Sequence, residues 1–220
     1  VGMEPAADLA REAGLAIGET GGIVVNDLMR TNDHDIYAAG DCVETRHLVS
    51  GQPTYLPMGS TANKMGRVAA NAISGVKDHF PGVVGSAICK VFDYNVARTG
   101  LSMSEALAAG FDADSVLAPG PDRPHFMPGA STMFIKLVYD RASRRLLGVQ
   151  VIGSGEADRR VDVAAMAVTM GWTVDQLANA DLSYAPPYSP AMDNLITAAN
   201  VARNKLDGLF QGITPAELHD

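Results

Sequence analysis

The residues best suited to chemistry lie in the segment Thr31 to Asp41, which reads TNDHDIYAAGD. Asp35 to Ala39 has the composition of a short strand, and Gly40 and Asp41 follow it directly. Small residues before Gly40 would let another group approach the backbone closely. A carboxylate just past a strand is suited to accept a hydrogen bond from a sugar or polyol hydroxyl. The same pattern also occurs in turns that bind nothing, so the segment alone leaves both interpretations open.

A second candidate is the segment 57–71, which reads PMGSTANKMGRVAAN and begins with small side chains. Its apolar spacing predicts a helix over 60–74, with Ser60 or Thr61 as the N-cap and Gly75 after the end. The first amide groups of a helix lack intrahelical acceptors and lie at the positive end of its dipole. They therefore attract an anion or an electron-rich oxygen. A capped helix that binds nothing is the alternative.

Together the two segments resemble the carboxyl-terminal half of the flavin-dependent pyridine nucleotide–disulfide oxidoreductases. The resemblance extends over residues 1–206 and is nearest to the coenzyme A disulfide reductase branch, with its relatives NADH oxidase and NADH peroxidase. It implies that Asp41 binds the ribityl-phosphate part of FAD and that Gly40 is the close-approach glycine. It also implies that backbone N–H groups lie under the flavin pyrimidine, namely those of Ser60, Thr61 and Ala62.

The string Tyr184-Ala185-Pro186-Pro187-Tyr188 is incompatible with a helix, because consecutive prolines remove donors and restrict the preceding residue. It resembles the motif of the coenzyme A branch, whose first tyrosine reaches across the dimer toward the partner's flavin and active cysteine. The resemblance implies that Tyr184 assists departure of a thiolate, with Tyr188 as the second candidate. A proline-rich turn that packs two aromatic rings is the alternative.

The chain departs from that branch at Phe126-Met127-Pro128-Gly129, where the branch carries Tyr-Tyr-Pro-Gly. One of those tyrosines helps to hold the substrate, and Phe126 brings no hydroxyl. The departure leaves a polysulfide, a persulfide or a peroxide open as substrate beside coenzyme A disulfide.

The resemblance implies that residues 1–80 form the end of an NAD domain and an incomplete FAD-binding α/β segment. Strands followed by helices predict an α+β domain at 82–206, an antiparallel sheet with helices, which the resemblance identifies as the dimerisation domain. Residues 207–220 are expected to be a linker, in which Ile213 to Leu218 resembles the start of a rhodanese domain. The expected strands are 23–25, 35–39, 88–94, 96–99, 115–118, 132–139 and 146–152. The expected helices are 6–13, 60–74, 102–109, 156–170, 174–178 and 190–206.

Three features that the resemblance requires have no counterpart in the 220 residues. They are a G-x-G-x-x-G for the FAD pyrophosphate, a redox cysteine, and a second G-x-G-x-x-G for the nicotinamide nucleotide. The sequence is therefore interpreted as the carboxyl-terminal part of an NAD(P)H:disulfide oxidoreductase. Missing amino-terminal FAD and NAD domains would complete its site, and the isolated chain is expected to be inactive. A homodimer is the expected assembly. A fragment of an NADH oxidase or peroxidase and a non-catalytic dimerisation module are the alternatives.

Composition removes several other classes of function. The net charge of −8 argues against nucleic-acid or polybasic membrane binding, and no apolar run reaches the length of a membrane helix. The two cysteines, Cys42 and Cys89, are too few for a disulfide scaffold, which fits a reducing cytoplasm. Neither stands in a C-x-x-C, so a packing role is expected for each. The five histidines show no metal-ligand spacing. Gly153 to Glu156 imitates a phosphate loop but lacks the Gly-Lys-Ser/Thr ending.

Overall fold

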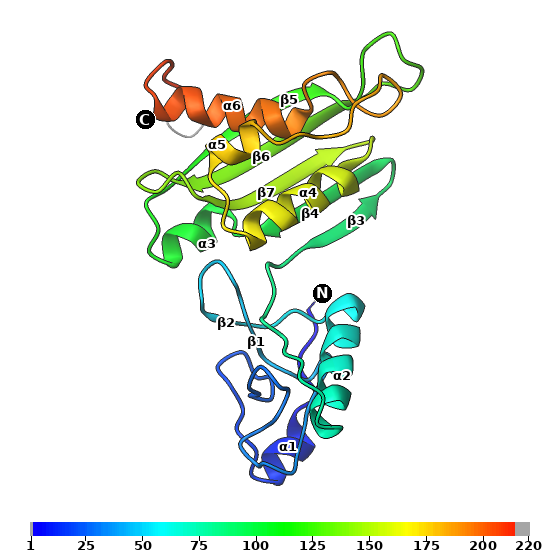
Figure 1. Ribbon diagram of the computed structural model, residues 1–220, viewed down its shortest axis with the longest axis vertical. Coiled ribbons are helices and arrows are strands. Elements are labelled where there is room, and N and C mark those ends of the chain that lie inside the picture. Colours follow the sequence, from blue (N-terminus) through cyan, green and yellow to red (C-terminus); the bar gives the residue numbers. More distant parts are fainter. Residues whose placement is uncertain (1, 214–220) are drawn as a thin grey trace. The chain divides into compact units, whose positions relative to one another are not determined.

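The computed structural model of the chain describes residues 2–213 and divides into two compact units, 1–83 and 84–220 (Figure 1). The first unit contains two helices, α1 (Asp8–Glu12) and α2 (Gly59–Ile73), joined by long loops. Two very short strands, β1 (Thr45–Arg46) and β2 (Pro53–Thr54), pair antiparallel within these loops. A small apolar core holds the unit together, formed by Met29, Val43, Met65, Val68, Ala69 and Phe80.

Helix α2 confirms the expected helix closely but begins differently. Met65, Val68 and Ala69 recur at helical spacing and are buried, while Ile73 on the same predicted stripe is exposed. The helix starts one residue earlier than expected, at Gly59. Its N-cap is Met58, and no side chain caps it, so the expectation of a Ser60 or Thr61 cap was wrong.

The strands expected at 23–25 and 35–39 do not form. Ile23 makes only isolated bridges, and Tyr37 makes a single bridge with Arg30. The hydroxyl of Thr31 lies 3.0 Å from the carbonyl oxygens of both Asp33 and Ile36. These local bonds from side chain to backbone stabilise a turn in place of a strand ladder.

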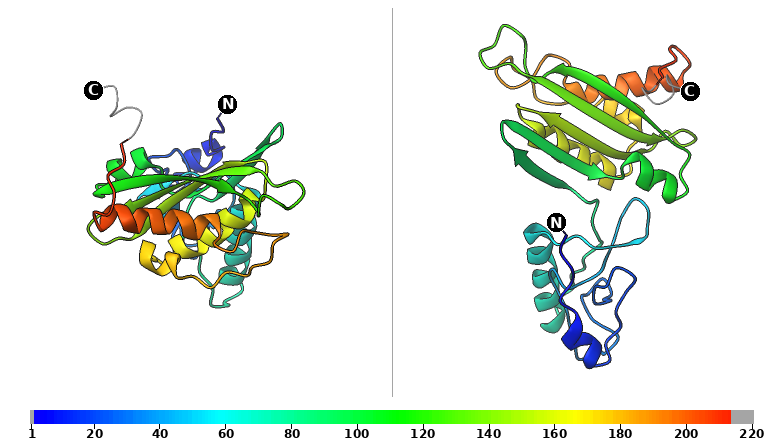
Figure 2. Two further views of the ribbon diagram at one scale, coloured as in Figure 1. Left: turned by 90° about the horizontal axis from the view of Figure 1, so that it is seen from above. Right: turned by 180° about the vertical axis from the view of Figure 1, so that it is seen from behind.

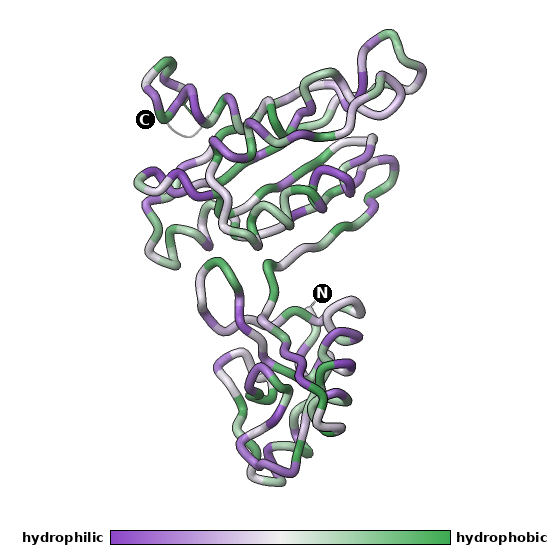
Figure 3. Tube along the Cα trace, in the orientation of Figure 1, coloured by the Kyte–Doolittle hydropathy of each residue, from purple (hydrophilic) through white to green (hydrophobic). Residues whose placement is uncertain are grey.

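The second unit is a five-stranded antiparallel sheet of order β3-β4-β7-β6-β5. Each strand overlaps a segment that the sequence predicts to be extended. The bounds are β3 (Ala87–Val91), β4 (Tyr94–Gly100), β5 (Ala113–Pro121), β6 (Thr132–Asp140) and β7 (Leu146–Gly153). The consecutive strands β6 and β7 pair antiparallel as a hairpin. Both strands are largely hydrophobic along their length (Figure 3).

Helices cover one face of this sheet, and no helix among the described residues covers the other face, called the bare face below. Helices α4 (Ala157–Thr169) and α6 (Asn194–Leu206) pack on it, with α5 (Val174–Ala178) beside α6 (Figures 1 and 2). Residues of β6 alternate accordingly: Ile135 is fully buried toward the helices, whereas 43% of Phe134 is exposed on the bare face. The helix α3 (Met103–Ala108) follows β4 and begins with a complete capping box at Ser102.

The last helix is shorter than expected. Residues 190–193 are not helical, and α6 begins at Asn194 because the Asp193 carboxylate accepts the Leu195 N–H at 2.9 Å. The expected rhodanese-like segment falls mostly on 214–220, which lie outside the described residues. Among residues 2–213, no helix is long and apolar enough to cross a membrane.

Candidate functional site

The structure brings the two segments singled out in the sequence together. Gly40 has a φ of +91°, a conformation that side chains disfavour, and its carbonyl accepts the Val43 N–H at 3.1 Å. A Cβ placed on Gly40 would lie 3.7 Å from the Cβ of Ala62, in the first turn of α2. The loop that carries Asp41 therefore lies against the amino-terminal end of α2.

Tyr55 completes this arrangement and was not expected from the sequence. Its hydroxyl donates to the backbone carbonyl of Asp41 at 2.9 Å and so fixes the loop. Burial raises the pKa of Tyr55, and the nearby Asp41 and Cys42 raise it further, because each disfavours the phenolate. No spacing rule links residues 41 and 55, so only the tertiary fold reveals the contact.

The first turn of α2 offers free donors. The N–H groups of Ser60 and Thr61 have no acceptor among residues 2–213, as expected for a helix start without a side-chain cap. Ala62 differs from the expectation, because its N–H donates to the Met58 carbonyl at 2.9 Å. Asp41 is exposed, and its carboxylate makes no hydrogen bond within the described chain. Free amide donors and a free carboxylate acceptor are thus presented by one small unit.

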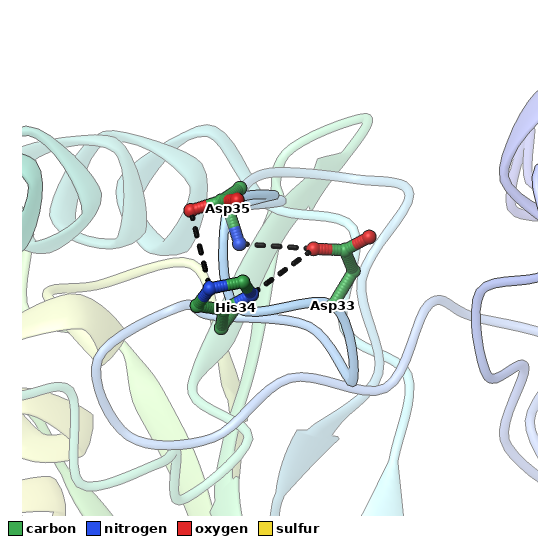
Figure 4. A group of neighbouring side chains, drawn as sticks. All are labelled: Asp33, His34 and Asp35. Atoms are coloured by element: carbon green, nitrogen blue, oxygen red, sulfur yellow. Dashed lines mark hydrogen bonds and ion pairs between the residues drawn. The ribbon is translucent and has the colours of Figure 1, made fainter.

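Asp33, His34 and Asp35 form a neighbouring cluster in the same loop, with their side chains pointing toward one another (Figure 4). Each imidazole nitrogen of His34 lies 3.7 Å from a carboxylate oxygen. The Asp35 N–H donates to the Asp33 carboxylate at 3.0 Å, which closes a turn. All three residues are exposed, so the cluster is explained by local turn formation.

The aromatic candidates lie in the second unit. Tyr184 is 52% exposed and Tyr188 is 60% exposed, and both stand in an irregular segment between α5 and α6. The Tyr188 N–H donates to the Ala185 carbonyl at 2.9 Å, which makes a tight turn around the two prolines. Phe126 is 67% exposed in the loop between β5 and β6. The candidate residues therefore fall into two groups, one in each unit.

Comparison with known families defines the class of both units. Residues 1–69 match the model of the pyridine nucleotide-disulphide oxidoreductases, and residues 86–196 match that family's dimerisation domain. The chain belongs to the pyridine nucleotide-disulphide oxidoreductase family. This result confirms the expected fold class, an α+β dimerisation domain preceded by part of a FAD-binding segment.

Several individual proteins are similar to the chain over most of its length. An NAD(P)H coenzyme A polysulfide/persulfide reductase of Pyrococcus horikoshii is 42% identical over 92% of this chain and 45% of its own. A coenzyme A disulfide reductase of Staphylococcus epidermidis is 32% identical over 89% of this chain and 45% of its own. An NADH oxidase of Methanocaldococcus jannaschii is 33% identical over 93% of this chain, again 45% of its own.

A solved structure is similar to the chain over nearly all of its residues. The NAD-dependent persulfide reductase of A. fulgidus has a TM-score of 0.96 and 51% identity, covering 99% of this chain and 41% of that one. The chain thus spans less than half the length of these relatives.

Proposed function

We propose that this chain forms part of the FAD site and the dimer interface of an NAD(P)H-dependent flavoprotein reductase. One observation carries the proposal: the Gly40–Asp41 loop lies against the uncapped first turn of α2, inside the region that matches the family. Bound FAD would supply the two-electron transfer between the nicotinamide and a sulfur substrate. The donors and the acceptor at this place suit a polar ligand with hydroxyl and carbonyl groups.

The donor and acceptor atoms of the residues at this place suit different parts of FAD. The Asp41 carboxylate is exposed and accepts hydrogen bonds from ribityl hydroxyls, and Gly40 before it has a positive φ that favours glycine. The amides of Ser60 and Thr61 donate toward the oxygens of the pyrimidine ring. Tyr55 holds the loop through the Asp41 carbonyl and does not itself need to touch the ligand.

A persulfide or polysulfide is the substrate class we propose. The polysulfide/persulfide reductase of P. horikoshii is 42% identical to this chain, and the persulfide reductase of A. fulgidus is 51% identical. Phe126 and Met127 also bring no hydroxyl where the coenzyme A branch carries two tyrosines, one of which helps to hold its substrate. In the overall reaction a persulfide RSSH, NAD(P)H and a proton yield the thiol RSH, hydrogen sulfide and NAD(P)+. The exposed hydroxyl of Tyr184 would donate a proton to the departing thiolate of a partner's site.

The assembly we propose is a homodimer formed through the second unit. Its bare sheet face exposes apolar side chains from four strands, namely Val96, Leu117, Phe134 and Ile152. These residues line a groove of about 510 Å³. Apolar surface of this kind is commonly buried in an interface, and a second copy would cover it.

The proposal is tested by FAD binding to the chain alone and to the chain co-expressed with the amino-terminal half of a relative. We expect the co-expressed pair to hold FAD, and Asp41→Asn to weaken FAD binding roughly tenfold, since one charge-assisted acceptor is lost. Asp35→Asn is the matched control, because that carboxylate lies in the same loop and is exposed. Equal FAD affinity in the Asp41 and Asp35 variants would contradict the assignment.

An NADH oxidase is the second candidate, favoured by the 33% identity to the M. jannaschii protein. The two activities give different products from the same reduced flavin. With NADH as donor, release of hydrogen sulfide from a persulfide supports the reductase. Oxygen consumption that is unchanged by persulfide supports the oxidase.

A further inference from the structure

Two irregular segments that carry the aromatic candidates lie side by side at one end of the second unit (Figures 1 and 2). One is the loop 122–131 between β5 and β6, with Phe126. The other is the segment 179–193 before α6, with Tyr184 and Tyr188. Neither segment has regular backbone pairing, so other contacts must hold the aromatic side chains in place.

Arg159 of α4 contacts the tyrosine segment on both sides of its turn. Its Nη2 donates to the Ser183 carbonyl at 2.7 Å, and its Nη1 donates to the Tyr188 carbonyl at 3.3 Å. These two carbonyls bracket the stretch from Tyr184 to Tyr188. A planar guanidinium carries donors on two separate nitrogens in a fixed geometry, so it can fix both ends at once, whereas an ammonium presents its donors from a single point.

Arg160, the next residue, contacts the other segment from inside the unit. Its side chain is 1% exposed, and its Nη2 donates to the Asp122 carbonyl at 2.9 Å. The same nitrogen lies 3.1 Å from the carboxylate of Asp193, the N-cap of α6. Arg160 therefore joins the base of the Phe126 loop to the end of the tyrosine segment.

The base of the Phe126 loop is itself closed by a buried carboxylate. Asp122 is 1% exposed, and it accepts the Ser131 N–H at 2.8 Å from the other end of the loop. A Cβ on Gly155 would lie within 2.4 Å of this carboxylate, so the turn before α4 must contain glycine there. The phosphate-loop-like string Gly153 to Glu156 thus has a packing role.

We propose that Arg159 and Arg160 are positioning residues that fix Tyr184 and Phe126 as one preassembled wall of the substrate site. Adjacent helix residues point roughly 100° apart, so one arginine reaches the surface turn while the other reaches the buried loop base. The inference rests on the proposed function, because only that function makes Tyr184 and Phe126 part of a substrate site. The arginine contacts themselves do not depend on that function.

The test measures amide hydrogen exchange in the full chain. Arg159→Met removes both carbonyl contacts, and we expect the Tyr188 and Ser189 amides to exchange roughly tenfold faster or more. Arg159→Lys should restore part of the protection, since the ammonium can reach one carbonyl. Arg141→Met is the control, because Arg141 pairs with Asp112 at the opposite end of β6. Unchanged exchange of Tyr188 and Ser189 in Arg159→Met would overturn the proposal.

Arg160 needs a gentler variant, because deleting a buried cation leaves Asp193 unpaired and threatens folding. Arg160→Lys keeps the charge, but its side chain is one bond shorter, so its ammonium falls short of the position from which Nη2 contacts both Asp122 and Asp193. We expect faster exchange at the Ser131 amide with little change at Tyr188, and the opposite pattern contradicts the assignment.

Activity of the chain co-expressed with an amino-terminal half separates this inference from the proposed function. A lower kcat for persulfide reduction in Arg159→Met, together with faster exchange, supports both. Faster exchange with an unchanged kcat upholds the contacts of Arg159 but contradicts a positioning role of Arg159 in the substrate site.

Discussion

At the scale of single residues, Gly40 is the position where backbone conformation matters most for the candidate site. Its φ of +91° lies in the left-handed half of conformational space, so Gly40→Ala should lower the free energy of unfolding by about 1–2 kcal/mol. Gly59→Ala is the control, because nothing lies within 4 Å of an added Cβ there. Urea denaturation compares the two variants. Equal stability of both would contradict the argument from strain.

Tyr55 allows a second test at the same scale. Tyr55→Phe removes only the hydroxyl that binds the Asp41 carbonyl, and it should cost about 0.5–1.5 kcal/mol of stability. Tyr94→Phe is matched to it, since Tyr94 is 55% exposed and its hydroxyl has no partner among the described residues. The two variants are compared by denaturation at pH 7, and an equal loss in both would refute the contact.

At the scale of elements, an ionic contact connects α6 to β5. The Lys205 ammonium lies 2.8 Å from the Asp114 carboxylate, and the Tyr139 hydroxyl donates to the same group at 3.2 Å. Burial alone would raise the pKa of Asp114, but the bond from Lys205 and those from its neighbours lower it below the usual value. Burial, followed by the charge of Asp114, raises the pKa of Tyr139.

The lowered pKa of Asp114 predicts how the stability of the chain depends on pH. Because the folded pKa of Asp114 is below the unfolded value of about 3.9, its contribution is present above that pH and lost as pH falls through the folded pKa. Asp114→Asn should therefore cost about 1.5–3 kcal/mol at pH 7. The difference from wild type should shrink toward pH 2–3. Urea melts across this range measure it, and a constant difference would contradict the ionic contact.

A comparison of the two units shows which strands the local sequence can predict. In the second unit, buried and exposed residues alternate in the first part of β6, whereas β7 is buried along most of its length, and both compositions predict extended backbone. The segments 23–25 and 35–39 have similar composition but remain loops, because each finds only isolated bridge partners within residues 2–213. Strand composition predicts extended backbone, whereas pairing depends on a neighbour that the local sequence does not specify.

At the scale of the whole molecule, the bare sheet face predicts the oligomeric state. A charge on that face would have to be desolvated in a dimer, so Ile152→Lys should convert a dimer to a monomer in sedimentation velocity. Met166→Lys is the control, since Met166 is 65% exposed on the opposite, helix-covered side. A dimer that survives Ile152→Lys would place the interface elsewhere on the unit.

The sequence by itself determined the family, the order of helices and strands in the second unit, and the candidate positions Gly40, Asp41, Ser60 and Thr61. These features depend on local patterns: helical spacing, alternation, turn residues and short motifs. The roles of those positions, and those of Tyr184 and Tyr188, stay predictions until FAD binding and turnover are measured.

Only the tertiary structure decided which groups meet. Tyr55 contacts Asp41 across 14 residues, and Arg160 contacts Asp122 across 38. It also decided that α2 begins without a side-chain cap, which leaves the Ser60 and Thr61 amides free while Ala62 is engaged. The physical reason is the same in each case. Such contacts connect residues that are distant in the chain, and their partners are fixed by packing of the whole unit.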